Sequence, residues 1–188
     1  MNKEQIKSLQ NRIGVDPDGV WGPKSTKAAE DHLRDLMPKN NPWPKSDQAS
    51  LREFYGRPGD ETNLVGLPVP DGVIVKYEGK QVATIRCHRK VADSLARVLV
   101  EVSKVKPGIL LEYAGCYNNR SVRGGSTPSL HAYGAAIDFD PDSNGNHTHW
   151  PTGATMPIEV MECFAKEGWK CAGAAWQRDA MHFEGTRP

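Results

Sequence analysis

A proline-rich segment near residue 40 limits how this chain can fold. Pro38–Pro44 contains three prolines within seven residues, and a proline inside a helix removes a hydrogen bond and clashes with the preceding turn. We therefore expect a semi-rigid spacer here rather than a continuous helix. The sequence predicts a small N-terminal unit over residues 1–38, a proline-rich linker over 39–49 and a main domain over 50–188.

The N-terminal unit has the pattern of two short helices. Apolar residues recur at three- and four-residue spacing from Ile6 to Ile13 and again from Ala28 to Leu33, which is helical spacing. Residues 14–23 between them are rich in glycine, aspartate and proline, and favour a turn. So short a unit buries little apolar surface, so we expect it to be marginal alone or to depend on its neighbour.

The main domain mixes strand and helix patterns. Residues 73–77 and 81–87 are β-rich runs that predict a hairpin, and residues 109–113 predict a further strand. Residues 91–105 place their apolar side chains on one helical face, and residues 158–167 predict a second helix. We therefore expect an α+β fold in which helices pack on a small antiparallel sheet.

The composition argues against two classes of partner. The formal net charge is +1, which provides no long-range field to attract nucleic acid. No segment approaches the roughly 20 apolar residues that span a bilayer, so we expect no membrane partner. The N-terminus lacks the apolar core of a secretory signal, and we expect the chain to be held in a cytoplasm.

The four cysteines are spaced too widely for a zinc knuckle or a redox centre. We expect them to be reduced, mostly buried thiols. The alternative is a disulfide between Cys87 and Cys116 or between Cys163 and Cys171.

Two potential metal ligands lie seven residues apart, on either side of a turn of small residues. His131 precedes Gly134, and Asp138 follows it in the run Ala136–Phe139. If that run is a strand, its alternation turns Asp138 away from the neighbouring Ile137, and the glycine allows the chain to bend. The histidine and the aspartate can then converge on one zinc ion.

A third potential ligand, His182, lies near the C-terminus, with Asp179 three residues before it. Three protein ligands plus water make an open, catalytic zinc site. Such a metal activates the bound water, while a nearby carboxylate moves the proton. We expect Asp179 to be that carboxylate, with Glu184 as the alternative.

These motifs resemble a known family. The patterns S-x-H-x-x-G-x-A-x-D and D-x-x-H are similar to those of the D-alanyl-D-alanine carboxypeptidases, which include vancomycin-resistance peptidases and phage L-alanyl-D-glutamate endopeptidases. The resemblance extends over Ser50–Glu184. It implies His131, Asp138 and His182 as ligands of one Zn²⁺, Asp179 as general base, and a hedgehog-like fold with its zinc site at the sheet.

The resemblance also implies an arginine upstream of the first ligand, which steadies the substrate carbonyl and its oxyanion. The segment Gly115–Gly125 offers Arg120, which we favour, and Arg123. Tyr117 and Ser129 are further candidates for substrate contact, and we expect Ser129 to orient the site by hydrogen bonding.

The N-terminal unit resembles the peptidoglycan-binding module of many cell-wall hydrolases. The shared pattern is L-Q-x-x-(I/L)-G-V-x-x-D-G-x-W-G-P-x-(S/T), found here over Leu9–Thr26. Typical modules have a third helix and a second turn, so this one is abbreviated. Asp18 and Trp21 are candidates for wall contact, although building the loop is the alternative role.

Together the resemblances imply a phage-type endolysin that hydrolyses the peptidoglycan stem peptide, with the L-Ala-D-Glu bond as the expected target. We expect a monomer that stays in the host cytoplasm until a separate holin opens the membrane, and then acts at the cell wall. One alternative is a D-alanyl-D-alanine carboxypeptidase of wall recycling or resistance. The other is a non-catalytic wall-binding protein.

Overall fold

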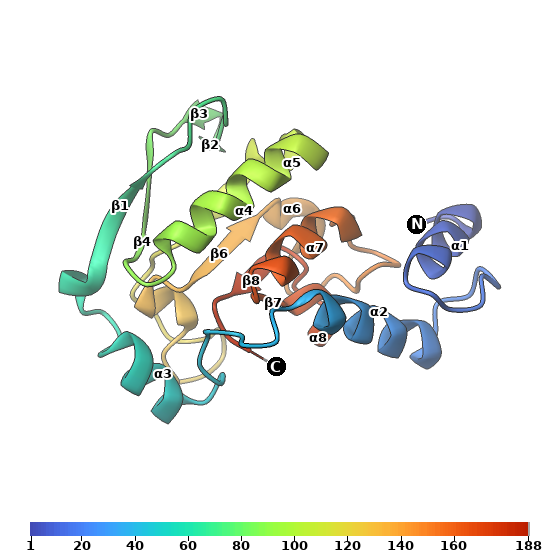
Figure 1. Ribbon diagram of the computed structural model, residues 1–188, viewed down its shortest axis with the longest axis horizontal. Helices are drawn as coiled ribbons and strands as arrows, with labels where there is room; N and C mark the ends of the chain where they lie inside the picture. Colours follow the sequence, from blue (N-terminus) through green and yellow to red (C-terminus); the bar gives the residue numbers. More distant parts are fainter. Residues whose placement is uncertain (188) are drawn as a thin grey trace.

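A four-stranded antiparallel sheet lies at the centre of the structure, a computed structural model that describes residues 1–187 (Figure 1). Its strand order is β5-β6-β8-β7. All the residues of β6 and β8 are buried, as expected where both faces of a sheet are covered. The four strands are β5 (Tyr113–Gly115), β6 (Ala136–Phe139), β7 (Lys170–Cys171) and β8 (His182–Glu184).

Two smaller antiparallel pairs form an arm at one end of the molecule (Figure 1). The predicted hairpin is partly correct, because β2 (Lys76–Tyr77) pairs with β3 (Lys80–Gln81) around Gly79. The rest of the second run, β4 (Thr84–His88), pairs instead with β1 (Leu64–Pro68). This pairing was not predicted from the sequence, because the hairpin turn fixes only its nearest residues.

Two long helices confirm their predictions. The apolar face of residues 91–105 forms α4 (Ala92–Val105), and residues 158–167 form α7 (Ile158–Lys166). The chain leaves α7 at Gly168, whose φ of 81° favours glycine. The remaining helices are α1 (Lys3–Arg12), α2 (Pro23–Leu36), α3 (Gln48–Tyr55), α5 (Pro107–Leu110), α6 (Pro141–Asn144), α8 (Ala172–Ala175) and the 3₁₀ turns Glu61–Asn63 and Leu130–Tyr133.

The strand predicted over residues 109–113 is wrong. This stretch begins inside α5, and β5 starts only at Tyr113. Pro107 occupies the first turn of α5, where its fixed φ favours a helix start. Ile109 and Leu110 are buried from that short helix, and a short apolar run has the same appearance in a buried helix and a buried strand.

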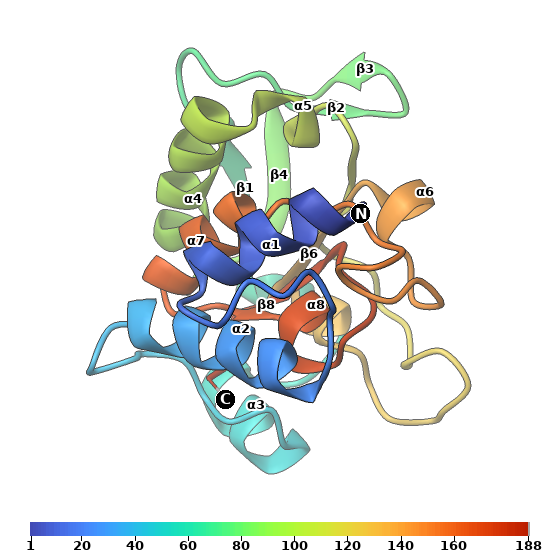
Figure 2. The ribbon, with the colours of Figure 1, turned by 90° about the vertical axis from the view of Figure 1, so that its right-hand side faces the viewer.

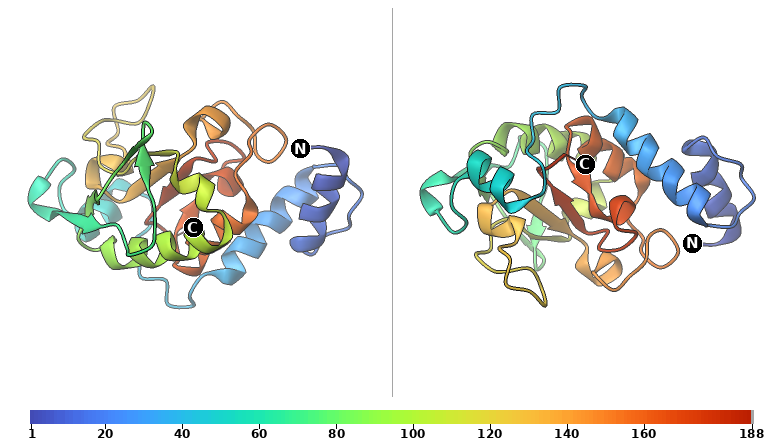
Figure 3. Two further views of the ribbon diagram at one scale, coloured as in Figure 1. Left: turned by 90° about the horizontal axis from the view of Figure 1, so that it is seen from above. Right: turned by 90° about the horizontal axis from the view of Figure 1, so that it is seen from below.

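The N-terminal helices confirm the predicted helix pair and pack against the rest of the chain. Figures 1 and 3 show α1 and α2 at the opposite end from β1. In Figure 2, which faces that end, α1 and α2 lie in front, and α2 contacts α7. Arg12 pairs with Glu162 of α7 through Nε–Oε1 and Nη2–Oε2 contacts, each of 2.7 Å. The Trp21 ring lies edge-on to Trp150, with ring centroids 5.5 Å apart. The domain limits at residues 38 and 49 stay a prediction.

The proline-rich segment is anchored by Trp43, which is 5% exposed. Its ring packs against Phe54 and Trp169, and its Nε1 donates to the Glu167 carbonyl at 2.9 Å. Asn41 Nδ2 donates to the Gly168 carbonyl at 2.8 Å. The segment therefore contacts the end of α7, and α3 begins within the predicted linker.

The predicted α+β class with small antiparallel sheets is confirmed. Cys87, Cys116, Cys163 and Cys171 are all free and buried, as expected for reduced thiols. Within residues 1–187, no helix combines the length and the apolar character that crossing a membrane requires.

Candidate metal centre

His131, Asp138 and His182 lie together in the central sheet. Each offers one ligand atom, and these atoms lie within 4.8 Å of one another. Asp138 on β6 is directly opposite His182 on β8 in the antiparallel register. His131 comes from the 3₁₀ turn, which Ser129 caps and Gly134 ends with a φ of 68°. We call these three residues the His-Asp-His cluster.

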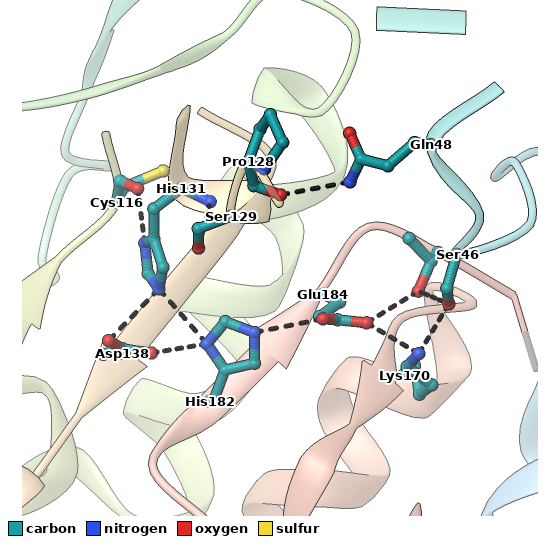
Figure 4. Close-up of polar contacts among 11 residues, drawn as sticks. Ser46, Gln48, Cys116, Pro128, Ser129, His131, Asp138, Lys170, His182 and Glu184 are labelled. Carbon is teal, nitrogen blue, oxygen red and sulfur yellow. Dashed lines mark hydrogen bonds and ion pairs between the residues drawn. The ribbon is translucent and has the colours of Figure 1, made fainter. Parts of the chain in front are cut away.

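One ring nitrogen of each histidine is oriented toward the centre of the cluster (Figure 4). His131 Nδ1 lies 2.7 Å from the Cys116 carbonyl, to which it can only donate, so His131 Nε2 is left with its lone pair facing Asp138. Such a contact fixes the tautomer of a metal-binding histidine. Asp138 Oδ1 lies 2.8 Å from His182 Nδ1. The three residues thus present a nitrogen, an oxygen and a nitrogen to one point.

The electrostatics favour a cation at this point. Burial disfavours the charged form of Asp138, yet the contacts of this carboxylate with the His131 and His182 rings outweigh burial and hold its pKa well below the usual range. Burial likewise opposes a charge on His182, but its hydrogen bonds to Asp138 and Glu184 and the negative charges of these carboxylates raise its pKa to about 10. The buried carboxylates therefore attract positive charge, which a proton or a metal ion can provide.

Glu184 lies on the other side of His182, with Oε1 3.2 Å from His182 Nε2. Burial opposes its charge, but His182 and Lys170 lower its pKa to about 2. The sequence alone indicated Glu184 only as an alternative to Asp179 as the base. Its position two residues after His182 on a strand was the signal for a shared face, since side chains repeat with a period of two.

Asp179 precedes β8 and lines the same cavity as His182. It adopts a φ of 57°, which is unusual for a residue other than glycine. Its Oδ1 atom is buried and has no hydrogen-bond partner among residues 1–187. Burial raises the pKa of this carboxyl group. A buried oxygen without a partner is a candidate for contact with a bound water or substrate.

Two cavities adjoin the cluster. A cavity of about 560 Å³, which we call the Trp176 cavity, is lined by Trp176, Asp179, His182 and Glu184, among others. A cavity of about 350 Å³, which we call the tyrosine cavity, is lined by Tyr77, Tyr113, Tyr117 and His131, among others. Asp138, Arg120 and Arg123 line both cavities.

The expected substrate residues lie around these cavities. Neither Arg120 nor Arg123 forms a salt bridge within residues 1–187, and Arg120 Nη1 donates only to the Ser121 carbonyl, at 3.2 Å. The Tyr117 hydroxyl lies 3.2 Å from Glu61 Oε1. Ser129 is buried and caps the turn that carries His131. The structure places these side chains near the cluster, and their roles in substrate binding stay predictions.

The N-terminal candidates lie apart from the cluster. Asp18 Oδ1 accepts from Gln10 Nε2 and from the Val20 amide, both at 2.8 Å, so this side chain helps to build its own loop. Trp21 lines a separate cavity of about 360 Å³ that also contains Gln177. Wall contact by either residue stays a prediction.

One protein family is similar to the region of the chain that holds the cluster. A family model described as D-alanyl-D-alanine carboxypeptidase matches residues 123–185, a third of the chain, and this range contains the whole cluster and Asp179. No curated protein and no solved structure matches the chain. The C-terminal third is therefore similar to the D-alanyl-D-alanine carboxypeptidases, which supports a cell-wall metallopeptidase of this general kind.

Proposed function

We propose that this chain is a zinc-dependent peptidase that cleaves the stem peptide of bacterial peptidoglycan. The observation that carries the proposal is the buried His-Asp-His cluster beside an Asp179 oxygen that has no hydrogen-bond partner among the residues that the structure describes. A structural zinc site uses four protein ligands, whereas three leave a position for water or substrate.

The donor set fits Zn²⁺, since imidazole nitrogen and carboxylate oxygen are among its usual ligands. When bound, the ion lowers the pKa of its water and polarises the scissile carbonyl. Asp179 would accept a proton at its free oxygen and pass it to the leaving amine. Arg120 or Arg123 would hold the carbonyl oxygen, where an uncompensated guanidinium stabilises developing negative charge.

An internal bond is the better candidate for cleavage than a terminal one. The Trp176 and tyrosine cavities both adjoin the cluster and share Asp138, so there is room for peptide on either side of a scissile bond. This supports an L-alanyl-D-glutamate endopeptidase acting as a phage endolysin. In this proposal a monomer is held in the host cytoplasm, a holin releases it, and peptidoglycan is its partner.

A D-alanyl-D-alanine carboxypeptidase is the second candidate, favoured by the description of the matching family. Mass spectrometry of digested sacculi separates the two. The endopeptidase releases fragments with a new N-terminal D-glutamate, whereas a carboxypeptidase releases only free D-alanine.

Chelation tests the zinc proposal. Removing metal should abolish sacculus clearance, and added zinc should restore it. Asp179→Ala should keep the metal and reduce turnover by about 10²–10⁴-fold, the usual contribution of a general base. Equal clearance by wild type and variant would show that Asp179 has no catalytic role. No clearance by either protein, together with no release of free D-alanine by the wild type, would favour a non-catalytic wall-binding protein.

A further inference from the structure

The contacts on the far side of His182 suggest a support for the metal ligand. We propose that Glu184 is a positioning residue that orients His182 toward the metal, and that Ser46, from the predicted linker, completes this support. The inference rests on the proposed zinc site, but it concerns how the site is held rather than which bond is cut.

The two ring nitrogens of His182 face different carboxylates. Nδ1 faces Asp138 and the interior of the cluster, while Nε2 faces Glu184 Oε1 (Figure 4). A metal-binding imidazole is neutral, because the ion takes the place of the proton on one nitrogen, and it has one N–H and one lone pair. Donation from Nε2–H to the carboxylate leaves the lone pair on Nδ1, the nitrogen in the cluster. Glu184 thereby selects the metal-binding tautomer and fixes the plane of the ring.

The Glu184 carboxylate is itself held by neighbouring side chains. Its other oxygen, Oε2, lies 2.7 Å from Lys170 Nζ and accepts from Thr186 Oγ1 at 3.0 Å. Lys170 on β7 is opposite Glu184 on β8 in the sheet register. Both carboxylate oxygens of Glu184 are engaged, whereas one oxygen of Asp179 has no hydrogen-bond partner in the described part of the chain. This difference assigns Glu184 to positioning and leaves proton transfer to Asp179.

The predicted linker contacts this support through Ser46. Lys170 Nζ donates to Ser46 Oγ at 2.6 Å, and Ser46 Oγ donates to Thr186 Oγ1 at 3.2 Å (Figure 4). The backbone follows the same path, because the Arg187 amide donates to the Pro44 carbonyl at 2.9 Å. Residues 44–46 therefore run beside residues 186–187, next to the Lys170 and Thr186 side chains that contact Glu184.

One aromatic ring adds a further restraint. Trp176 stacks on the His182 ring at a centroid distance of 5.7 Å and an interplanar angle of 24°. Lys170 Nζ lies 5.3 Å from the centroid of the same indole. The lysine thus contacts both groups that fix His182, the carboxylate and the indole, and its own position depends on Ser46.

The test measures zinc affinity without substrate, by competition with a chromophoric chelator, and the absorption spectrum of the Co²⁺-loaded protein. Glu184→Gln should weaken zinc binding by about 10–100-fold, the usual effect of removing such a partner, and should shift the Co²⁺ bands. Ser46→Ala should weaken it several-fold. In the double variant the effect of Ser46→Ala should largely disappear, since both residues act through one carboxylate.

The control is Glu162→Gln, which removes a buried carboxylate that pairs with Arg12 and His32, away from the cluster. It should keep wild-type zinc affinity. Ser46 is exposed, so its variant keeps the test decisive if Glu184→Gln does not fold.

The outcomes separate this inference from the proposed function. Wild-type zinc affinity in both Glu184→Gln and Ser46→Ala would overturn it, even if Glu184→Gln lost turnover, because Glu184 would then be a base rather than a support. Failure of the wild type to bind zinc would instead overturn the proposed zinc peptidase.

Discussion

Replacing Trp43 by alanine should lower the free energy of unfolding by about 3–5 kcal/mol, the usual cost of removing a large aromatic side chain from a core. Trp43 is 5% exposed, although it lies in a proline-rich segment. Its ring centroid lies 6.4 Å from that of Phe54 and 5.9 Å from that of Trp169. Its indole N–H also donates to the Glu167 carbonyl.

The two contributions can be separated. Trp43→Phe keeps an aromatic ring but loses the hydrogen bond, whose net value is about 0.5–1.5 kcal/mol. We expect a loss of about 1–2 kcal/mol for this variant, because a smaller ring also leaves some space. Since domains are stable by only about 5–15 kcal/mol, the alanine variant should lose a large part of its stability.

Urea unfolding followed by circular dichroism measures both losses. Trp176→Ala is the comparison variant, since that tryptophan is 41% exposed, against 5% for Trp43. It should cost less than about 1 kcal/mol, as most surface substitutions do. A loss below about 1 kcal/mol for Trp43→Ala would mean that residues 39–49 behave as a loose spacer and contribute no core.

Two further predictions concern other contacts. Burial raises the pKa of Glu162, but hydrogen bonds from Arg12 outweigh burial and lower this pKa overall. Glu162→Gln should therefore lower the free energy of unfolding by about 1–2 kcal/mol at pH 7. This value is reduced for solvent screening, because Arg12 is partly exposed. The stability that the lowered pKa of Glu162 contributes is present above the usual carboxyl pKa of about 4.3 and is lost at lower pH. The urea midpoints of wild type and Glu162→Gln should therefore converge as the pH falls below that value. A difference between the midpoints that stays constant with pH would contradict the prediction. Gly134→Ala should cost more than about 2 kcal/mol, because a Cβ at its φ of 68° would lie 2.9 Å from the His88 amide nitrogen. Gly14→Ala, at a φ of 73° in open space, should show only the backbone strain of about 1 kcal/mol, and equal melting temperatures for the two variants would refute the steric argument.

The spacing of apolar residues predicted those helices and strands whose formation depends on residues close together in the sequence. The apolar face of residues 91–105 predicted the helix α4 through its helical period, and the assumption that Ala136–Phe139 forms a strand is met by β6. The strand expected at 109–113 failed because a short apolar run has no period that separates helix from strand. The pairing of β1 with β4 depends on contacts between distant residues, which no local pattern records.

The candidate site shows the same limit. His131 and Asp138 could be paired from the sequence because a glycine turn joins them within one segment. Ser46 could not be connected to the site, since it lies 124 residues from Lys170 and makes its contact only in the folded chain. The linker was predicted from its prolines alone, and prolines indicate where a helix stops but not what the segment touches.

The side chains of β8 alternate between the candidate site on one face and the hydrophobic core on the other. Phe183 is fully buried and stacks on Phe164 of α7 at a centroid distance of 3.9 Å. Its neighbours His182 and Glu184 therefore share the opposite face, where the adjacent strand supplies Asp138. A shift of one residue in this register would place the phenylalanine in the cluster and the histidine in the apolar core. The burial of Phe183 thus fixes the geometry of the proposed metal centre, because any loss of the site by register shift would also cost the core packing.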